Sequence, residues 1–428
     1  MKKALIITYY WPPSGGSGVQ RWLKFAKYLP EFGWEPIIYT PENPDMSITD
    51  MALLNDISPD LKVLKQPIWE PYGLARLFKK KGIAQNTGVV KEQGSWIQKL
   101  SLWIRGNVFL PDPRVYWVKP SISYLISHLK SNPVDLIITT GPPHSLHLIG
   151  LGLKEKLGLK WVADFRDPWS KLDFFEKYKM SKASKNKHLK LELQVLQRSD
   201  LCLTVSKYWE NDFKALGANM TACITNGYDE DDFVNYLPKK EDRFIIGHFG
   251  LLNSFRSSPA LWSSLDSICE ENDLFKEKLE IRLCGVVDNQ VLEQISKYKH
   301  LSSRINYKGY LSHSDIIKEY EQSALLLLLL NDSDIANGHL PGKLFEYLIC
   351  RKPILALGLE KSDVSEILKA TQCGRVCSFD DTKSIKKEIL NAFNTWGGQK
   401  RELNNEEISK YSRKSLAEIL AKTLDNTL

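Results

Sequence analysis

The 428-residue sequence has no long apolar run. Its longest, from Ala324 to Leu330, is far shorter than the about 20 residues that a membrane-spanning helix needs. Such a short run is typical of a strand that is buried on both faces. The N-terminus is basic and then apolar, but it runs into Trp11-Pro12-Pro13 without the small-residue cleavage site of a signal peptide. We therefore predict a cytoplasmic protein.

Cysteine is scarce, and its spacing suits no metal site. Of the 7 cysteines, only Cys373 and Cys377 lie close together, and no second pair completes a zinc site. An odd and scattered set also argues against a disulfide framework. We predict reduced thiols in the core and no metal ligands.

Two nucleotide-binding fingerprints are incomplete. Arg21 occupies the position at which the glycine-rich segment 12–18 would need a third glycine for dinucleotide binding. The pair Gly342-Lys343 is followed by Leu344, and Asn337 stands where a P-loop has its first glycine. The sequence therefore gives no support to NAD binding or P-loop ATP hydrolysis, while a phosphate-bearing ligand remains compatible with it.

The length predicts two domains, because 428 residues exceed a single ordinary core. Short β-rich runs alternate with helical patterns in both halves, which predicts α/β domains with parallel, doubly wound, Rossmann-like sheets. The predicted strands are 4–8, 35–40, 134–139, 159–163, 201–205 and 222–225, and then 244–247, 279–284, 305–307, 325–330, 354–357 and 375–377.

The predicted first domain covers 1–232 and includes an irregular insertion at about 41–118, rich in Trp, Pro and Lys. The second domain covers 240–396. We expect the helical tail, 397–428, to pack against one of the two domains, for example against the first. Ligands bind beyond the carboxyl ends of such strands. We therefore expect the chemistry in a cleft between the domains.

The first domain offers three candidate elements. Gly15 and Gly16 lie between the first strand and its helix, where backbone and helix N-terminus can approach an anion, although a flexible turn is the alternative. The segment Asp164-Phe165-Arg166-Asp167 follows a strand, and its charges can orient sugar hydroxyls or form a structural ion-pair network. His144 lies where a loop enters a helix, and only that position favours function over a structural role.

The second domain repeats the arrangement with Gly250 and Arg256 after its first strand. Arg256 can pair with a diphosphate through two hydrogen bonds. Lys343 and Glu346 stand three apart at a predicted helix start, on one face. An ammonium there can hold phosphate and a carboxylate can accept two hydrogen bonds from a ribose diol, but a solvated surface ion pair is an equal alternative.

These motifs together resemble glycosyltransferase family 4, retaining enzymes of GT-B fold. The resemblance covers essentially the whole chain and depends on the order of five elements: Gly15-Gly16, Thr140 to His144, Asp164 to Trp169, Asn226-Gly227, and Lys343 to Tyr347. It implies a nucleoside-diphosphate sugar as donor substrate, with no further cofactor and no divalent metal. It also implies retention of the anomeric configuration and a glycan or lipid-linked sugar as acceptor, in cell-surface polysaccharide synthesis.

The resemblance assigns roles to residues as well. Glu346 would bind the ribose, and Arg256 and Lys343 would bind the diphosphate. The glycine loops at Gly15, Gly16 and Gly250 would approach the phosphates or the sugar. We take Asp167, Arg166 and His144 as catalytic candidates.

Two positions depart from the family pattern. Many relatives carry two glutamates eight positions apart in the donor motif, and here Gly338 replaces the first of them. Many also have histidine before the aspartate where this chain has Arg166 before Asp167. The catalytic assignment therefore stays open. A nucleotide-sugar epimerase of similar fold and a non-catalytic nucleotide-sugar-binding partner of an assembly complex are the alternative functions.

The net charge of +7 is concentrated in two segments, Lys79-Lys80-Lys81 and 177–190. A solvated surface is the simpler interpretation. The alternative is peripheral contact with anionic lipid at the inner membrane face, supported by apolar residues in the neighbouring sequence. No nucleic-acid-binding motif accompanies the charge, so we predict no nucleic-acid partner. Those apolar residues are Leu74, Leu77, Phe78, Trp96, Trp103 and Ile104.

Overall fold

The computed structural model describes residues 1–46, 48–71, 96–171, 178–239, 241–331, 337–397 and 402–428. Two compact units divide the chain. The first unit consists of Met1–Thr225 together with Arg413–Leu428, and the second unit is Asn226–Ser412. The predicted basic and apolar residues of 72–95, and Lys177, lie outside the described residues.

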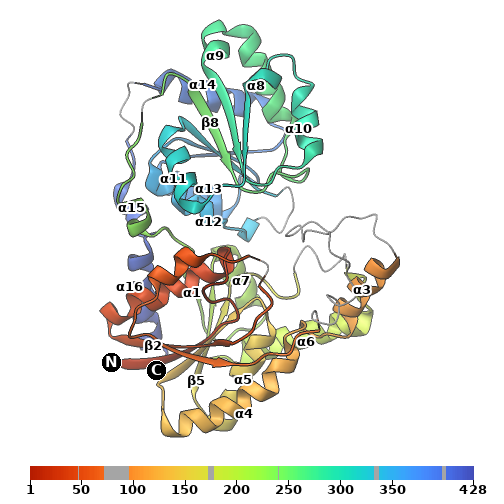
Figure 1. Ribbon diagram of the computed structural model, residues 1–428, viewed down its shortest axis with the longest axis vertical. Helices are drawn as coiled ribbons and strands as arrows, with labels where there is room; N and C mark the ends of the chain where they lie inside the picture. The colour runs from red at the N-terminus through yellow and green to blue at the C-terminus, as the bar shows by residue number, and fades with distance from the viewer. Residues whose placement is uncertain (47, 72–95, 172–177, 240, 332–336, 398–401) are drawn as a thin grey trace. The chain divides into compact units, whose positions relative to one another are not determined.

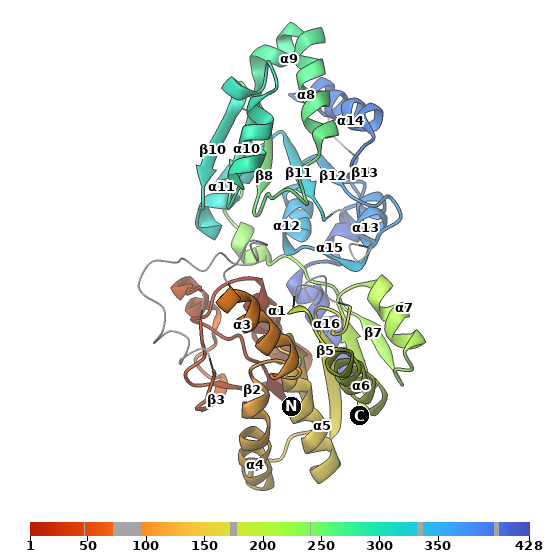
Figure 2. The ribbon, with the colours of Figure 1, turned by 90° about the vertical axis from the view of Figure 1, so that its right-hand side faces the viewer.

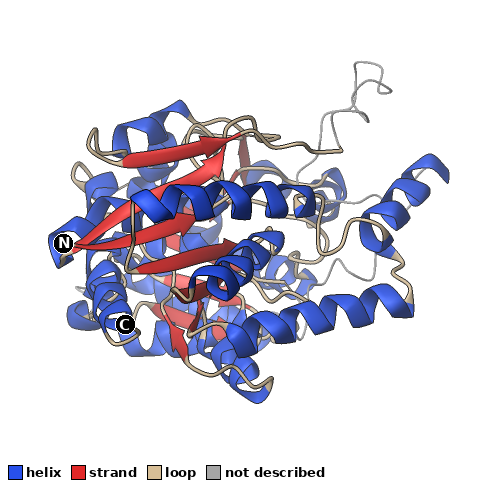
Figure 3. Ribbon diagram, turned by 90° about the horizontal axis from the view of Figure 1, so that it is seen from below, coloured by secondary structure: helices blue, strands red, loops and turns tan. Residues whose placement is uncertain are grey.

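The first unit contains a seven-stranded parallel sheet in the order β3-β2-β1-β4-β5-β6-β7. Figure 3 shows helices on both faces of these strands. The strands are β1 (Lys2–Ile7), β2 (Trp34–Pro41), β3 (Lys62–Gln66), β4 (Leu136–Gly141), β5 (Lys160–Phe165), β6 (Leu201–Thr204) and β7 (Thr221–Cys223). The helices are α1 (Ser17–Tyr28), α3 (Trp96–Asn107), α4 (Val115–Ser131), α5 (Ser145–Leu157), α6 (Lys182–Arg198), α7 (Lys207–Ala215) and α16 (Arg413–Asp425).

The last helix of the chain belongs to the core of the first unit. Helices α1 and α16 pack together on one face of the sheet, and α4, α5 and α6 pack in succession (Figure 1). Leu416, Leu420 and Leu424 of α16 are buried with the apolar residues of α1 and β1. The indole Nε1 of Trp34 donates to Asp425 Oδ1 at 2.9 Å. The two ends of the chain therefore stabilise the same core.

The segment 41–118 was expected to be irregular, but it contains β3, α3 and the start of α4. Strand β3 has the sequence Lys-Val-Leu-Lys-Gln and lies at the edge of the sheet, where none of its residues is fully buried. An edge strand can keep charged residues because one of its sides faces water. The segment therefore lacks the continuous apolar run that identified the other strands.

The second unit contains a six-stranded parallel sheet in the order β10-β9-β8-β11-β12-β13. All six strands coincide with predicted ones, and Figure 2 shows most of them side by side. They are β8 (Phe244–Phe249), β9 (Leu279–Cys284), β10 (Ile305–Gly309), β11 (Leu325–Leu329), β12 (Ile354–Leu357) and β13 (Gly374–Cys377). The helices are α8 (Pro259–Glu271), α9 (Asp273–Lys278), α10 (Asn289–Ser296), α11 (His313–Gln322), α12 (Gly342–Cys350), α13 (Asp363–Thr371), α14 (Thr382–Thr395) and α15 (Asn405–Ser409).

Strand β11 consists of leucines and is buried on both faces. Alternate side chains of a strand point to opposite faces of the sheet. Leu325, Leu327 and Leu329 belong to the hydrophobic layer formed with α8 and α14. Leu326 and Leu328 belong to the opposite layer, formed with α12 and α13. The prediction of a strand buried on both faces is confirmed.

Both sheets reverse their strand order at an internal position, between β1 and β4 in the first unit and between β8 and β11 in the second. Ligands of doubly wound sheets bind beyond the carboxyl ends of the strands at such positions. The loops that follow β1 and β8 carry the predicted glycines. The order of the strands therefore directs attention to these two edges.

None of the helices in the described ranges has the length and apolar character to cross a membrane. All seven cysteines are free thiols, and six of them are buried.

Candidate functional site

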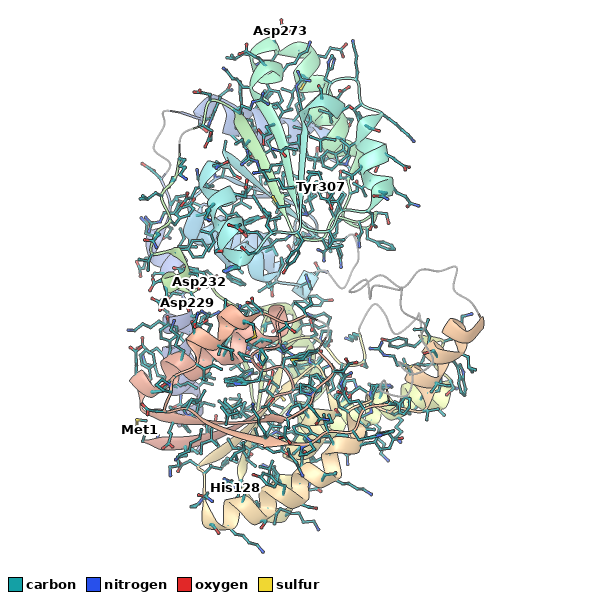
Figure 4. All side chains as sticks on the ribbon, viewed as in Figure 1. Met1, His128, Asp229, Asp232, Asp273 and Tyr307 are labelled. Atoms are coloured by element: carbon teal, nitrogen blue, oxygen red, sulfur yellow. The ribbon has the colours of Figure 1, made fainter. Side chains whose placement is uncertain are left out.

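In the second unit, the loop after β8 makes a close backbone turn at Gly250. Its φ of +122° is a conformation that side-chain-bearing residues rarely adopt, and its N–H donates to Cys284 O at 2.7 Å. A Cβ on Gly285 would lie 2.4 Å from Gly250 O. The Tyr307 hydroxyl donates to Gly285 O at 3.2 Å in the same region (Figure 4). Two glycines therefore let the backbones after β8 and β9 approach each other closely.

Lys343 lies in the first turn of α12 and points to this loop. Its Nζ donates to Phe249 O at 3.0 Å, and a Cβ on Gly250 would lie 3.4 Å from the Nζ. Burial first, and then the charge of Arg256, lower the pKa of the ammonium to about 7, although Glu346 opposes both effects. The hydrogen-bond acceptor of Lys343 is a neutral carbonyl oxygen, so its charge is available to an anion.

Arg256 reaches the same edge from the segment between β8 and α8. Its Nε donates to Asn331 Oδ1 at 2.8 Å, and its Nη1 lies 3.4 Å from Leu251 O. Burial lowers the pKa of the guanidinium. Asn331 lies two residues after the end of β11, on the other side of the strand reversal. Two half-buried cations with neutral partners thus repel each other, and a bound anion would relieve that repulsion.

Glu346 lies one turn further along α12. Its Oε2 accepts from the Tyr320 hydroxyl at 2.7 Å, and its Oε1 lies 3.2 Å from His313 Nε2. Burial, and then Glu346 itself, raise the pKa of Tyr320 well above its usual value, so the hydroxyl stays a donor. The Glu346 side chain is 26% exposed. Tyr320 and His313 orient the Glu346 carboxylate, which is also accessible to solvent. Such a carboxylate can accept hydrogen bonds from a diol.

The start of α12 adds a third source of positive potential. The helix begins at Gly342, and a Cβ there would meet nothing within 4 Å, so the space in front of the backbone is open. Helix N-termini carry partial positive charge and unsatisfied N–H groups. The structure therefore brings Gly250, Arg256 and Lys343 together at one edge, with Glu346 one turn away on the same helix.

Four residues at this site were not predicted to belong to it: His248, His313, Tyr320 and Asn331. His248 is fully buried, and its ring nitrogens lie 3.3 Å from Leu327 O and 3.4 Å from Leu251 O. Burial and the neighbouring Lys343 lower its pKa, so the ring is neutral. His248 could have been suspected from its position beside Gly250. Nothing in the sequence around His313 or Tyr320 indicates a contact with Glu346.

In the first unit, the glycine loop after β1 is fixed on one side. Gly15 N donates to Ile48 O at 2.9 Å, and a Cβ on Gly15 would lie 2.9 Å from the Ile48 side chain. Gly16 has φ +93°, is exposed, and directly precedes α1. A Cβ there would meet nothing within 4 Å. Gly15 is thus required for packing, whereas Gly16 is open to a ligand.

Asp164 forms the structural network that the sequence left as an alternative. Its carboxylate is fully buried and accepts from Arg21 Nη2 at 2.9 Å, Trp22 Nε1 at 2.7 Å and Thr140 Oγ1 at 2.8 Å. Arg21 also donates to the carbonyl oxygens of Ile224 and Thr225. Burial raises the pKa of Asp164, but Arg21 and these hydrogen bonds outweigh it and lower the pKa below its usual value.

Arg166 and Asp167 lie beside that network and are half-buried. Arg166 Nη1 donates to Gly18 O at 2.6 Å, and Nη2 donates to Pro142 O. The guanidinium therefore links the first turn of α1 to the loop after β4. Asp167 opposes the burial that lowers the pKa of Arg166.

His144 is the residue before α5, as predicted, and is 5% exposed. Its ring stacks on Trp169 with centroids 4.9 Å apart and planes at 8°. Neither ring nitrogen has a hydrogen-bond partner among the residues that the structure describes. Burial, His147 and Arg166 all lower the pKa of His144, so the ring is neutral. A neutral imidazole with two unused nitrogens remains a candidate for hydrogen bonding to a substrate.

Within the described ranges, no three or more His, Cys, Asp or Glu side chains are grouped so that they could hold a metal ion.

No protein-family model matches the sequence, and no curated protein matches it. Solved structures match by fold. Sucrose-phosphate synthase from Thermosynechococcus elongatus has a TM-score of 0.65 at 13% identity, covering 100% of this chain and 99% of that one. The lipopolysaccharide outer core galactosyltransferase WaaB has a TM-score of 0.59 at 11% identity, covering all of both chains.

HepE of Anabaena, solved in complex with UDP-glucose, has a TM-score of 0.55 at 14% identity, covering 99% of this chain and 95% of that one. Identities this low establish similarity of fold and not of activity. Two doubly wound parallel sheets of seven and six strands, shared along the whole chain with these proteins, show that the protein has the GT-B fold.

Proposed function

We propose that the protein is a glycosyltransferase that uses a nucleoside-diphosphate sugar. The proposal depends on the residues at the carboxyl edge of the second unit's sheet, where the strand order reverses between β8 and β11. There, Lys343 and Arg256 have neutral hydrogen-bond partners and Glu346 is oriented by Tyr320. Two cations suit a diphosphate, and an accessible carboxylate suits the adjoining ribose. Enzymes of the same fold that transfer sugars support the same conclusion.

Each residue then has a separate task. Glu346 accepts hydrogen bonds from the ribose hydroxyls, while Lys343, Arg256 and the N-terminus of α12 offset the charge of the diphosphate as it leaves the sugar. The backbone at Gly250 leaves room for the phosphates. Because cationic groups perform this task, we propose that transfer needs no divalent metal.

We further propose that the carboxyl edge of the first unit binds the acceptor. Gly16 offers an open backbone approach, and Asp167 and His144 are the groups that can contact the reacting atoms. Arg166 acts as a positioning residue, because it donates to Gly18 O at the start of α1 and to Pro142 O in the loop after β4.

The resemblance to family 4 supports the finer parts of the proposal. These are retention of the anomeric configuration, a hexosyl or N-acetylhexosaminyl donor, and a glycan or lipid-linked acceptor of cell-surface polysaccharide synthesis. The same resemblance supports assignment to that family.

A thermal-shift screen against UDP-, GDP- and dTDP-sugars tests the donor class. A ligand present at 100 times its Kd stabilises the state that binds it by about 2.7 kcal/mol, so the matching nucleotide should raise the melting temperature by several degrees. Failure of every nucleotide sugar to do so would contradict the proposal.

The donor that binds is then incubated with and without candidate acceptors. Transferase activity requires an acceptor or water and releases the nucleoside diphosphate. Conversion of the donor sugar into its epimer without release of nucleotide would instead identify an epimerase. Binding without any turnover, hydrolysis included, would identify a binding partner.

A further inference from the structure

Helix α3 exposes apolar side chains that none of the other described elements covers. Leu100 is 47% exposed, Trp103 is 45% exposed, and Val108, directly after the helix, is 54% exposed. From Leu100 to Asn107, Gly106 is the one fully buried residue. Exposing several apolar residues in one place opposes the hydrophobic effect and marks an interaction site.

The end of α3 is fixed to the start of α6 (Figure 1). Asn107 Oδ1 accepts from Ser181 N at 2.7 Å and from Ser184 Oγ at 3.0 Å. A Cβ on Gly106 would lie 2.7 Å from Tyr178 Cβ, and the Arg105 guanidinium stacks 5.1 Å from the Tyr178 ring. The apolar residues of α3 and the first turns of α6 therefore form one continuous surface.

The α6 part of this surface is strongly basic. Residues 178–191 contain no Asp or Glu and five lysines, all of them exposed. None of the five forms an ion pair with a residue that the structure describes. The buried face of α6 uses other residues, including His188 and Glu192. The lysines are Lys179, Lys182, Lys185, Lys187 and Lys190.

This charge does not stabilise the fold. Like charges three or four residues apart on a helix, such as Lys182 and Lys185, repel each other. The carboxylate of Glu192 is turned away from them and accepts from the backbone N–H groups of Trp169 and Ser170. The lysines are thus positioned to meet negative charge outside the protein.

We propose that the surface formed by Leu100, Trp103, Val108 and these five lysines docks onto an anionic lipid bilayer. A bilayer supplies both parts of the required chemistry, because it offers negatively charged headgroups over an apolar interior. Apolar side chains enter the headgroup boundary by about 5–10 Å, and basic side chains beside them bind the headgroups. A nucleic acid would satisfy the lysines but not Leu100 or Val108. The proposal depends on observations separate from the donor site.

Co-sedimentation of the whole protein with vesicles tests the proposal. We expect binding to phosphatidylcholine vesicles that contain phosphatidylglycerol, and much weaker binding to phosphatidylcholine alone. Binding should weaken as salt is added, because screening shortens the range of the lysine charges. Absence of binding to the anionic vesicles at low salt would overturn the proposal.

Two variants identify the surface. Lys182→Glu with Lys185→Glu should lower the vesicle partition coefficient about tenfold or more. Lys383→Glu with Lys387→Glu is the matched control, because it reverses two exposed lysines on α14 of the second unit with the same change in net charge. An equal loss in the control would show that net charge alone causes binding, and would overturn the proposal.

Leu100→Ser with Trp103→Ser tests the apolar part without changing any charge. We expect it to lower vesicle binding severalfold while salt sensitivity remains. Unchanged binding would show that the lysines alone bind the anionic surface, and it would refute bilayer docking. Nucleotide-sugar binding should persist in every variant, so loss of vesicle binding and failure of the proposed donor site are distinguishable.

Discussion

The two units place charged residues at equivalent edges of their sheets but use them differently. In the first unit, Asp164 is surrounded by Arg21, Trp22 and Thr140, so its charge is matched inside the protein. In the second unit, Lys343 and Arg256 donate to neutral oxygens. The amount of charge at a sheet edge therefore does not distinguish a structural network from a binding site. In our proposal, the charges of the hydrogen-bond partners make this distinction, because Asp164 has a cationic partner whereas Lys343 and Arg256 have neutral ones.

The difference between the two units predicts that the largest effect of a substitution is a loss of stability in the first unit. Arg21→Met leaves the Asp164 carboxylate buried without its cation, and breaking a buried ion pair in this way costs about 3–5 kcal/mol. Urea denaturation should report the loss as an earlier unfolding transition. Asp167→Asn, at a half-buried neighbouring position, should change the stability by only about 0.5 kcal/mol. Similar losses in both variants would remove the distinction between the two carboxylates.

The second prediction concerns affinity without loss of stability. Glu346→Ala removes a carboxylate that we assign to the ribose, and hydrogen bonds to a charged group contribute about 1.5–3 kcal/mol. Calorimetric titration with the nucleotide found by the screen should show a Kd raised about tenfold to a hundredfold. Glu366→Ala, on the exposed side of α13, is the control that leaves the Kd unchanged. An unaltered Kd in the Glu346 variant would refute the assignment.

The third prediction uses the pKa of Lys343, which is about 7 in the free protein. A bound diphosphate favours the ammonium, so binding raises this pKa, and affinity is greatest below pH 7 and falls as the pH rises through it. Between pH 6 and pH 9 the Kd for the nucleotide sugar should rise about tenfold, which corresponds to one pKa unit of coupling. Lys343→Arg keeps the charge at all these pH values and should abolish the trend. A wild-type affinity independent of pH would argue against phosphate contact by Lys343.

A smaller effect is expected from Tyr320→Phe. This change removes the hydroxyl that orients Glu346 but keeps the ring packed against Phe249. One hydrogen bond contributes about 0.5–1.5 kcal/mol, so nucleotide affinity should fall about twofold to tenfold. In the Glu346→Ala background the same substitution should have no effect on affinity. Equal effects in both backgrounds would show that Tyr320 acts independently of the carboxylate.

The fifth prediction is an absence of effect. Because two cations and a helix start take the role of a metal in our proposal, EDTA should leave donor turnover unchanged. Activity lost on chelation and restored by manganese would refute the metal-free mechanism. Calorimetry of the nucleotide with and without magnesium provides the corresponding binding measurement.

Elements with regular local patterns could be predicted from the sequence, and those defined by distant contacts could not. The leucine run of β11 and the strand-helix alternation carry their own signal. Strand β3 does not, because an edge position tolerates Lys62 and Lys65. The helix start predicted just before Lys343 is also confirmed, because α12 begins at Gly342. The partners Tyr320 and His313 come from α11, and only folding brings them to Glu346.

The same reasoning explains why Asp164 was ambiguous. Its partners come from α1 and β4, more than twenty positions away in the sequence, and no short motif records them. Burial of the carboxylate decides between a network and a site, and burial is a property of the packed chain. Positions of charged residues beside a strand end can therefore be predicted, whereas their availability to a ligand cannot.

The return of α16 to the first unit has a consequence for synthesis in the cell. The ribosome releases Leu416, Leu420 and Leu424 only after the entire second unit has emerged. Domains generally fold in the order of translation, but here the earlier one lacks part of its core until α16 has been synthesised. The apolar surface that α16 covers stays exposed while the second unit is made, so termination of translation before α16 would damage the unit that was made first.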